Sequence, residues 1–311
     1  MNIQDQNFGI EIELTGITRA RAAQIIAQHF GTNRTEHVSD GYDTHRALDT
    51  KGRWWKCSRD VSIRPEVKIN GRIQQRNEGR TSSDLRCEMV SPICQYSDIE
   101  DVQEIIRKLR AAGAMANDSC GIHVHVDGKN HTPDSLVRLM NLTVGRQDII
   151  YEALQIGDRA NRWCKKINRD LLMAMRHDKD RSKASIERIW YSRANDGYEG
   201  RIDHQHYNST RYHGVNLHAF FTKGTVEFRL FNGTTHAGKI KAYIQFCLAM
   251  SAWAINAKDS YSFQKMDGRD KAKAFEDLLT RRLKLRGKEY ATCRLHLMSV
   301  FTPAETTEQT A

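Results

Sequence analysis

The amino-acid sequence predicts an α+β fold. Three segments, 8–14, 121–127 and 225–231, place charged residues at alternate positions with apolar residues between them, which is the period of a β-strand. Other segments, such as 135–155, carry apolar residues at the spacing of an amphipathic helix. Strands and helices are thus mixed along the chain, and we expect helices to pack against a sheet.

The length of the chain, 311 residues, is sufficient for one substantial hydrophobic core. Only 4 residues are proline, and no segment rich in Pro, Gly and Ser separates one part from another. We therefore expect residues 1–301 to form a single domain with a basic insertion at 158–212. Residues 302–311 are polar, and we expect them to be a disordered tail.

Charge and cysteine content narrow the class of protein. A formal net charge of +10 favours polyanionic partners such as nucleotides, nucleic acid or acidic polypeptides. The 7 cysteines are widely spread without a CxxC pair, and no signal sequence is recognisable, which favours a reducing cytoplasm. Residues 242–257 are apolar but short for a membrane span, and Gln245 and Asn256 interrupt them, so we expect a core helix and no membrane partner.

The first half of the chain predicts mostly short elements. After the strand at 8–14, a helix is expected over 17–30, and Gly31 ends it. The polar stretch 32–53 predicts no element. The remaining predictions in this half are short strands at 54–56 and 61–63, an exposed loop or hairpin tip at 69–80, a strand from 87 until Pro92, and a helix from Ser97 and Asp98 to Gly113.

The second half alternates strands with longer helices. The strand at 121–127 precedes the helix at 135–155, for which Thr132 and Asp134 are candidate caps. Residues 158–212 are the most cationic part of the chain, and their position suggests an insertion between two sheet elements. The last predicted elements are a hairpin of strands 215–221 and 225–231 around Lys223 and Gly224, and helices at 237–257 and 270–285.

One face of the three patterned strands carries ionisable groups. Because side chains alternate across a strand, each of these sets shares a face: Glu11 and Glu13; His123, His125 and Asp127; Glu227 and Arg229. Carboxylates gathered this closely raise one another's pKa values unless a cation lies among them. The pattern favours a divalent metal site over a hydrated face, and oxygen ligands suit Mg²⁺, with Mn²⁺ more tolerant of histidine.

Five segments in a fixed order resemble the amidoligase family, a branch of the glutamine synthetase and glutamate-cysteine ligase superfamily. They are GIEIE (9–13), CEMVSPI (87–93), GIHVHVD (121–127), RYHGVNLH (211–218) and TVEFRLFNGT (225–234). The resemblance spans residues 7–235. It implies a curved, mainly antiparallel, glutamine synthetase-like sheet with helices on one face, which holds divalent metals, ATP and a carboxylate substrate. That carboxylate would become an acyl phosphate, which an amine captures to form an amide or isopeptide bond.

The resemblance also implies roles for individual residues. The implied metal ligands are Glu11, Glu13, Glu88, His123 and Glu227. Of the two histidines, His125 is expected to contact the substrate or to support a ligand, and Glu13 and Arg229 are expected to take part in catalysis, with Arg229 meeting the transferred phosphate. Expected contacts to substrate or phosphate are Arg211 and Asn216, together with Asp60 and Ser62, which can equally be simple turn residues.

Other functions stay open at the level of sequence. The same carboxylates can activate water in a metal-dependent nuclease or phosphoesterase whose basic insertion binds nucleic acid, although this interpretation is less favoured than a ligase. A third alternative is an inactive nucleic-acid-binding module. The basic insertion itself is either a solvated helical face or a surface for phosphate or an acidic peptide, and a peptide or protein is a candidate substrate.

Overall fold

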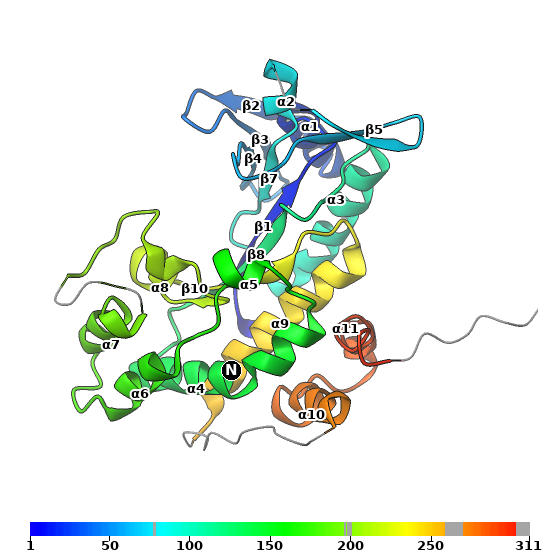
Figure 1. Cartoon of the computed structure of the whole chain (residues 1–311). Coiled ribbons are helices and arrows are strands. Elements are labelled where there is room, and N and C mark those ends of the chain that lie inside the picture. Colours follow the sequence, from blue (N-terminus) through cyan, green and yellow to red (C-terminus); the bar gives the residue numbers. More distant parts are fainter. Residues whose placement is uncertain (77–78, 196, 198–200, 259–269, 303–311) are drawn as a thin grey trace, which may run out of the picture.

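The computed structural model describes residues 1–76, 79–195, 197, 201–258 and 270–302. Its centre is an antiparallel sheet with the strand order β2, β3, β4, β7, β1, β8, β10, β9 (Figure 1). The strands are β1 (Phe8–Leu14), β2 (Thr35–Val38), β3 (Thr44–Leu48), β4 (Trp54–Ser58), β7 (Cys87–Val90), β8 (Gly121–Asp127), β9 (Val215–Asn216) and β10 (Thr225–Asn232). This confirms a mixed fold with a mainly antiparallel sheet.

The three patterned strands form the middle of the sheet. Strand β1 pairs with β7 on one side and with β8 on the other, and β8 pairs in turn with β10. Their apolar residues are almost fully buried, with Ile12, Val124 and Phe228 each 0% exposed. Alternation of side chains explains this arrangement, because one face of each strand enters the hydrophobic core and the charged residues are left on the other.

Long helices cover the apolar face of the sheet. Helix α1 packs against β3 and β4, α9 packs against β8 and β1, and α3 and α4 pack against α9. Their bounds are α1 (Arg19–His29), α3 (Ile99–Ala111), α4 (Pro133–Ala153) and α9 (Ala237–Asn256). Thr132 caps α4 by accepting a hydrogen bond from the Ser135 amide at 3.2 Å, as the sequence predicts.

The cationic segment 158–212 lies at one side of the sheet and contains short helices (Figure 1). They are α5 (Arg159–Arg162), α6 (Arg169–His177), α7 (Lys183–Trp190) and the 3₁₀ turns Arg193–Asn195 and Ser209–Arg211. Leu171, Ile186 and Trp190 anchor this segment by burial in the core. Its apolar side chains therefore hold it against the body of the protein, while the charged residues stay outside.

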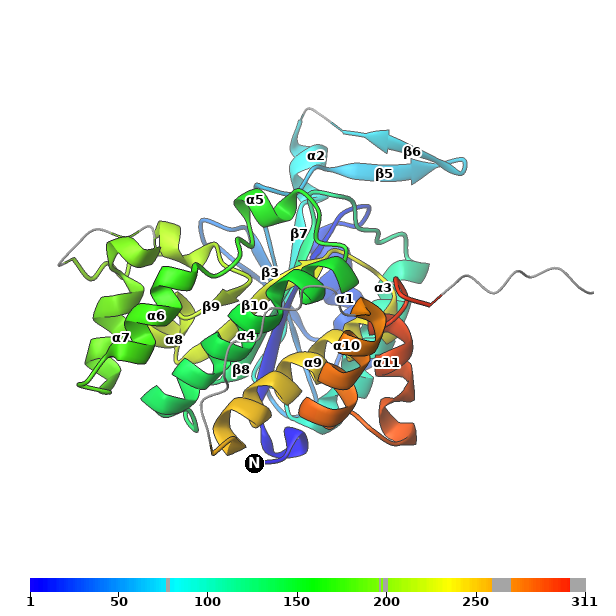
Figure 2. The ribbon, with the colours of Figure 1, turned by 60° about the horizontal axis from the view of Figure 1, so that its bottom comes forward.

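The remaining elements lie at the periphery (Figure 2). A separate hairpin of β5 (Glu66–Ile69) and β6 (Arg72–Gln75) turns through Asn70 and Gly71, both with positive φ, so the predicted hairpin tip is found there. The other helical segments are Ile3–Asp5, α2 (Arg80–Asp84), Tyr96–Asp98, α8 (His218–Lys223), α10 (Lys271–Asp277), the π-helical turn Leu278–Arg282, Lys288–Tyr290 and α11 (Ala291–Leu297).

Two predicted strands are wrong. Residues 61–63 form a turn, because the Asp60 carboxylate accepts a hydrogen bond from the Ser62 amide at 2.7 Å and closes it. In the predicted hairpin, only Val215–Asn216 pairs with β10, and the chain then continues as α8 up to Gly224, whose φ of 75° ends the helix.

Several elements are absent from the sequence predictions, or fall outside what the structure describes. Strands β2 and β3 occupy the polar stretch that predicted no element, and α11 was not predicted. Within the described residues, no helix is long and apolar enough to cross a membrane, and α9 is a core helix as expected. Residues 303–311 of the predicted disordered tail lie outside the described residues, and the single-domain organisation stays a prediction.

Candidate active site

Cross-strand pairing brings the ionisable residues of four strands together. Glu11 lies opposite His123, Glu13 lies opposite Glu88, and Glu227 lies opposite His125. The Nδ1 atom of His123 is 3.0 Å from Oε2 of Glu11, and Nε2 of His125 is 3.2 Å from Oε1 of the same carboxylate. Glu11 thus stands between the two imidazoles.

A second set of contacts fixes Glu227 at the edge of this group. Arg229 Nη1 donates to Glu227 Oε1 at 2.7 Å, and Asn216 Nδ2 donates to Glu227 Oε2 at 2.6 Å. The register between β10 and β8 shifts between Phe228 and Phe231, so Arg229 lies within an irregular stretch of the strand. Bulges of this kind commonly re-aim a side chain next to an active site.

Three further carboxylates crowd one another on the other side of Glu11. Ligand atoms of Glu13, Asp60 and Glu88 lie within 4.8 Å of one another. Burial and the nearby Asp60 charge raise the pKa of Glu13 to about 7, although the Gly121 amide donates to this carboxylate at 2.6 Å. Burial, followed by the charges of Glu11 and Glu13, raises the pKa of Glu88 as well. This cluster is short of positive charge.

The pKa values of the neighbouring Glu11, Glu227 and His123 are lowered instead. Burial opposes ionisation of Glu11, but His125 and His123 outweigh it and lower its pKa. Burial also opposes ionisation of Glu227, and Arg229 outweighs it, so this pKa is lowered too. Burial and the positive charge of Arg229 lower the pKa of His123 to about 4. At neutral pH this imidazole is therefore uncharged, the form that binds metals.

The donor set fits divalent cations. Three trios offer ligand atoms within 4.8 Å of one another: Glu11, His125 and Glu227; Glu11, Glu88 and His123; Glu13, Asp60 and Glu88. The two trios that contain Glu88 are mostly carboxylate, which suits Mg²⁺ and Mn²⁺. The sequence placed His123 among the ligands and His125 outside them, whereas the structure brings both imidazoles within ligand distance of a shared carboxylate.

One buried atom supports the fit independently. His125 Nδ1 is 2.9 Å from the Thr225 hydroxyl, whereas its Nε2 is buried without a hydrogen-bond partner and faces Glu11 and Glu227 at 3.2 and 3.7 Å. In the neutral tautomer that donates from Nδ1 to Thr225, Nε2 presents a lone pair to two carboxylates. Such an arrangement is repulsive unless a cation lies between them.

A cavity of about 310 Å³ opens above this carboxylate floor. Glu11, Glu13, Glu88 and His123 line it from the sheet, and five cations line it as well: Arg59, Arg159, Arg211, Lys223 and the buried Arg229 of β10. Carboxylates and cations that border one space form a site that suits phosphates held through metal ions. Arg211, Ser62 and Asp60, which were predicted to contact phosphate or substrate, line this cavity. Asn216 and His125 do not line it: Asn216 contacts Glu227, and His125 lies beside Glu11.

The sequence did not single out Arg159, Lys223 and Tyr42, although all three line the cavity. Arg159 approaches the start of β8 and donates to the Cys120 carbonyl at 3.2 Å, and a side chain at Gly121 would collide with its guanidinium. Lys223 Nζ lies 3.7 Å from Glu11 Oε1. The glycine that opens the GIHVHVD segment was the one available signal for Arg159.

Other candidates have structural roles. His218 is buried, and its Nδ1 atom is 2.7 Å from the Tyr191 hydroxyl, so it is a hydrogen-bonded core histidine. The thiols of Cys87, Cys94 and Cys120 are free and buried, and burial raises the pKa of Cys94 and of Cys120 to about 12. All three therefore have a packing role in the core. For Cys94 and Cys120 the raised pKa also makes the thiol a poor nucleophile.

A neighbouring cavity of about 320 Å³ shares Glu11 and Lys223 with the first. Its lining is more apolar, with Phe8, Ile10, Val90, Pro92 and Ile93 beside His125 and Asp127. Two cavities of different character therefore meet at the Glu11 carboxylate.

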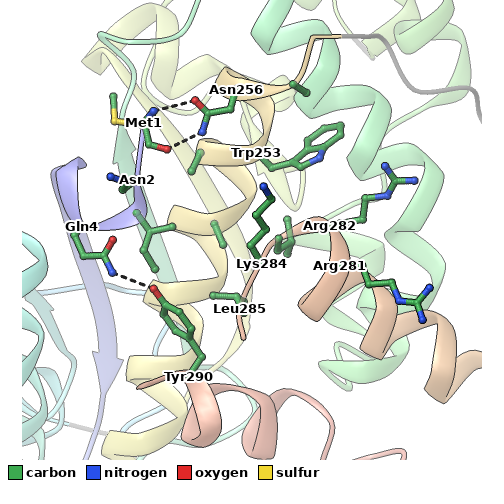
Figure 3. Close-up of a pocket in the computed structure, with 15 residues that line it drawn as sticks. Met1, Asn2, Gln4, Trp253, Asn256, Arg281, Arg282, Lys284, Leu285 and Tyr290 are labelled. Carbon is green, nitrogen blue, oxygen red and sulfur yellow. Dashed lines mark hydrogen bonds between the residues drawn. The ribbon is translucent and has the colours of Figure 1, made fainter. Parts of the chain in front are cut away.

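A third cavity, of about 510 Å³, lies between the N-terminus, the end of α9 and the π-helical turn (Figure 3). The Met1 amino group donates to Asn256 Oδ1 at 2.9 Å, and Gln4 Nε2 donates to the Tyr290 hydroxyl at 3.0 Å. Basic side chains line it, and Lys284 extends toward Trp253 (Figure 3). None of the site residues predicted from the sequence lies there.

Residues 4–251 match the family described as "Putative amidoligase enzyme". The chain belongs to this family. The match covers all four strands that carry the charged face, β1, β7, β8 and β10, and ends within α9. A search of curated proteins finds no match. Membership of the amidoligase family indicates an enzyme of the ligase class, with a carboxylate and an amine as its substrates.

Proposed function

We propose that this amidoligase-family protein is an ATP-dependent carboxylate-amine ligase that works through an acyl-phosphate intermediate. The observation that carries the proposal is the set of three overlapping ligand trios on and beside one sheet face, at a cavity that five cations line. The glutamine synthetase-like character of the sheet is part of the same proposal. It is supported by the antiparallel order of β7, β1, β8 and β10 with a ligand on each.

The proposed cofactors are two or more Mg²⁺ or Mn²⁺ ions. Glu11, Glu13, Glu88, His123 and Glu227 would hold them, and we add His125 and Asp60 because each completes one of the trios. Bound there, the ions would neutralise charge on the ATP phosphates during transfer. His125 is supported as a ligand by its unpaired Nε2 atom.

The chain's own residues would position and stabilise the transferred phosphoryl group. Arg229 is held by Glu227 at Nη1 and by the Trp163 carbonyl at Nε, 3.3 Å away, so its guanidinium is fixed before substrates bind. Lys223, Arg159 and Arg211 surround the same space. Preorganised cations of this kind stabilise a phosphoryl transition state more than the ground state.

The reaction has two bond exchanges. A carboxylate oxygen of the substrate attacks the γ-phosphorus of ATP, and the bond to ADP breaks. The amine nitrogen then attacks the activated carbonyl carbon, phosphate leaves, and the amine's proton passes to a base in the cavity. The two cavities that meet at Glu11 and Lys223 support separate entry of two substrates.

The decisive experiment is calorimetric binding of a non-hydrolysable ATP analogue with and without Mg²⁺, in wild type and Glu227→Gln. Glu104→Gln is the matched control, because Glu104 is an exposed carboxylate that pairs with the exposed Arg107. We expect Mg²⁺-dependent binding in wild type and in the control, and its loss in Glu227→Gln. The carboxylate and amine substrates can then be screened by ADP release.

Absence of nucleotide binding would overturn the proposal. The metal-dependent nuclease or phosphoesterase considered from the sequence has no support from the family match, and cleavage of nucleic acid with Mg²⁺ but without ATP would revive it. A peptide or protein substrate stays a proposal based on the basic lining of the cavity.

A further inference from the structure

A separate group of ligand-type side chains lies on the β2–β3 hairpin, outside the carboxylate floor. His37 and His45 are direct partners in the register of the two strands. Their rings stack with centroids 4.5 Å apart and an interplanar angle of 18°. The stacked pair thus brings imidazole nitrogen atoms from two strands close together.

Asp43 completes the group from the loop that joins the two strands. Its Oδ1 atom is 2.7 Å from His37 Nε2, and one ligand atom from each of His37, Asp43 and His45 lies within 4.8 Å of the others. Asp43 has a φ of 48°, an uncommon left-handed conformation that aspartate tolerates better than most residues. The backbone of the loop thus turns this carboxylate toward the histidine pair.

A buried arginine fixes the orientation of Asp43. Arg19 is 2% exposed, pairs with Asp43 Oδ2, and donates from Nε to the Asp43 carbonyl at 3.0 Å. Its Nη1 also donates to the carbonyls of Ser83 and Arg86 at 2.7 and 3.0 Å. Arg19 therefore occupies one oxygen of the carboxylate and leaves the other for the histidines, which is how outer hydrogen bonds orient metal ligands.

We propose that His37, Asp43 and His45 form a second metal site, which binds a transition ion such as Zn²⁺. Two imidazoles and one carboxylate suit Zn²⁺ and its neighbours in the first transition row, whereas Mg²⁺ prefers oxygen ligands. His37 is 55% exposed, so water has access to complete the coordination. The site differs in ligand chemistry from the carboxylate floor and takes a different class of ion.

The position of the site has a consequence for the cavity above the carboxylate floor. Gly41 and Tyr42 lie in the same short loop as Asp43 and line that cavity. Tyr207, which belongs to the cationic segment, lies near Tyr42 and lines the same cavity. A metal held by His37, Asp43 and His45 would tie both ends of the loop together and restrain this part of the cavity lining.

The test is a Co²⁺ titration of the full chain with saturating Mg²⁺, followed by visible absorption and by displacement with Zn²⁺. The variants are His37→Asn, His45→Asn and the double variant. The matched control is His204→Asn, because His204 is 53% exposed and lies 2.7 Å from Glu187, yet belongs to no ligand trio among the described residues. Asp43 is left unchanged, since its loss would remove a charged partner of the buried Arg19.

We expect wild type and His204→Asn to bind one Co²⁺ that Zn²⁺ displaces, and each hairpin variant to bind it at least about ten-fold more weakly. Unchanged Co²⁺ binding in the double variant would overturn the site. Zn²⁺ should also slow amide hydrogen exchange across residues 39–43 in wild type and not in His45→Asn. Equal exchange in the two would overturn the restraint on the loop while leaving the metal site in place.

Discussion

Two clusters of buried carboxylates in this protein are built in opposite ways. In the first, Arg53 bridges Asp49 and Asp98 at 2.8 Å each, and Lys51 pairs with Asp98. Burial would raise the pKa of Asp98, but hydrogen bonds from Arg53 and Lys51 outweigh it and lower the pKa to about 2. This cluster carries its own cations.

In the second cluster, on the charged face of the sheet, no ion pair with Lys or Arg is found for Glu13, Asp60 or Glu88 in the described part of the chain. Burial and mutual repulsion raise the pKa values of Glu13 and Glu88. Buried charges without partners cost stability, so a protein keeps them where something else supplies the positive charge. This contrast is the reason why we propose a metal site at the second cluster and not at the first.

The largest expected effect concerns the charged face. Glu227→Gln should reduce ADP formation by about a thousand-fold once substrates are known, because it removes a charged ligand and the partner of Arg229. The rate is measured at saturating ATP and Mg²⁺, with Asp98→Asn as the comparison from the first cluster. An equal loss in both variants would remove the distinction between the clusters.

The second largest expected effect is a loss of stability when the first cluster is altered. Asp98→Ala should lower the free energy of unfolding by about 3 to 5 kcal/mol, because Arg53 and Lys51 lose their buried partner. Denaturant unfolding with and without Mg²⁺ should give the same loss. Asp148→Ala is the control, since Asp148 is 89% exposed beside Lys166, and less than about 1 kcal/mol is expected there.

The pH dependence of the first cluster follows from the lowered pKa of Asp98. A carboxylate with a depressed folded pKa stabilises the protein above its unfolded pKa of about 3.9, and this stability is lost as the pH falls toward about 2. The stability difference between wild type and Asp98→Asn should therefore shrink by about 2 kcal/mol between pH 5 and pH 2. A difference that stays constant over this range would show that the ion pairs do not depress the pKa.

The smallest expected effect is a gain of stability rather than a loss. In EDTA at neutral pH, Glu88→Gln should stabilise the protein by about 1 kcal/mol, which corresponds to roughly 2 to 4 °C in Tm, because it removes one of the repelling charges. Saturating Mg²⁺ should raise the Tm of wild type more than that of the variant. Destabilisation in EDTA would mean that Glu88 already has a cationic partner.

Much of the sheet and its charged face could be predicted because both depend on short-range alternation. The segment at 8–14 is a strand with the predicted bounds, and its pairing with β7 and β8 follows from which face must be buried. Strands β2 and β3 were not predicted because most of their residues are polar, although only β2 is mostly exposed and β3 is buried or half-buried. The apolar pattern after Asn216 is compatible with a strand or with a helix. The segment forms helix α8 because of its packing beside β10, which the sequence pattern does not reveal.

The sequence by itself therefore determined the central strands, the face that each presents, and the ligand types that this face carries. Tertiary structure decided which further groups reach that face, because Arg159, Lys223 and Tyr42 arrive from loops and short helices whose placement depends on contacts with distant residues. It also decided the shortage of positive charge around Glu13 and Glu88. Alternation along one strand is a local property, whereas the balance of charge in a buried space depends on every segment that borders it.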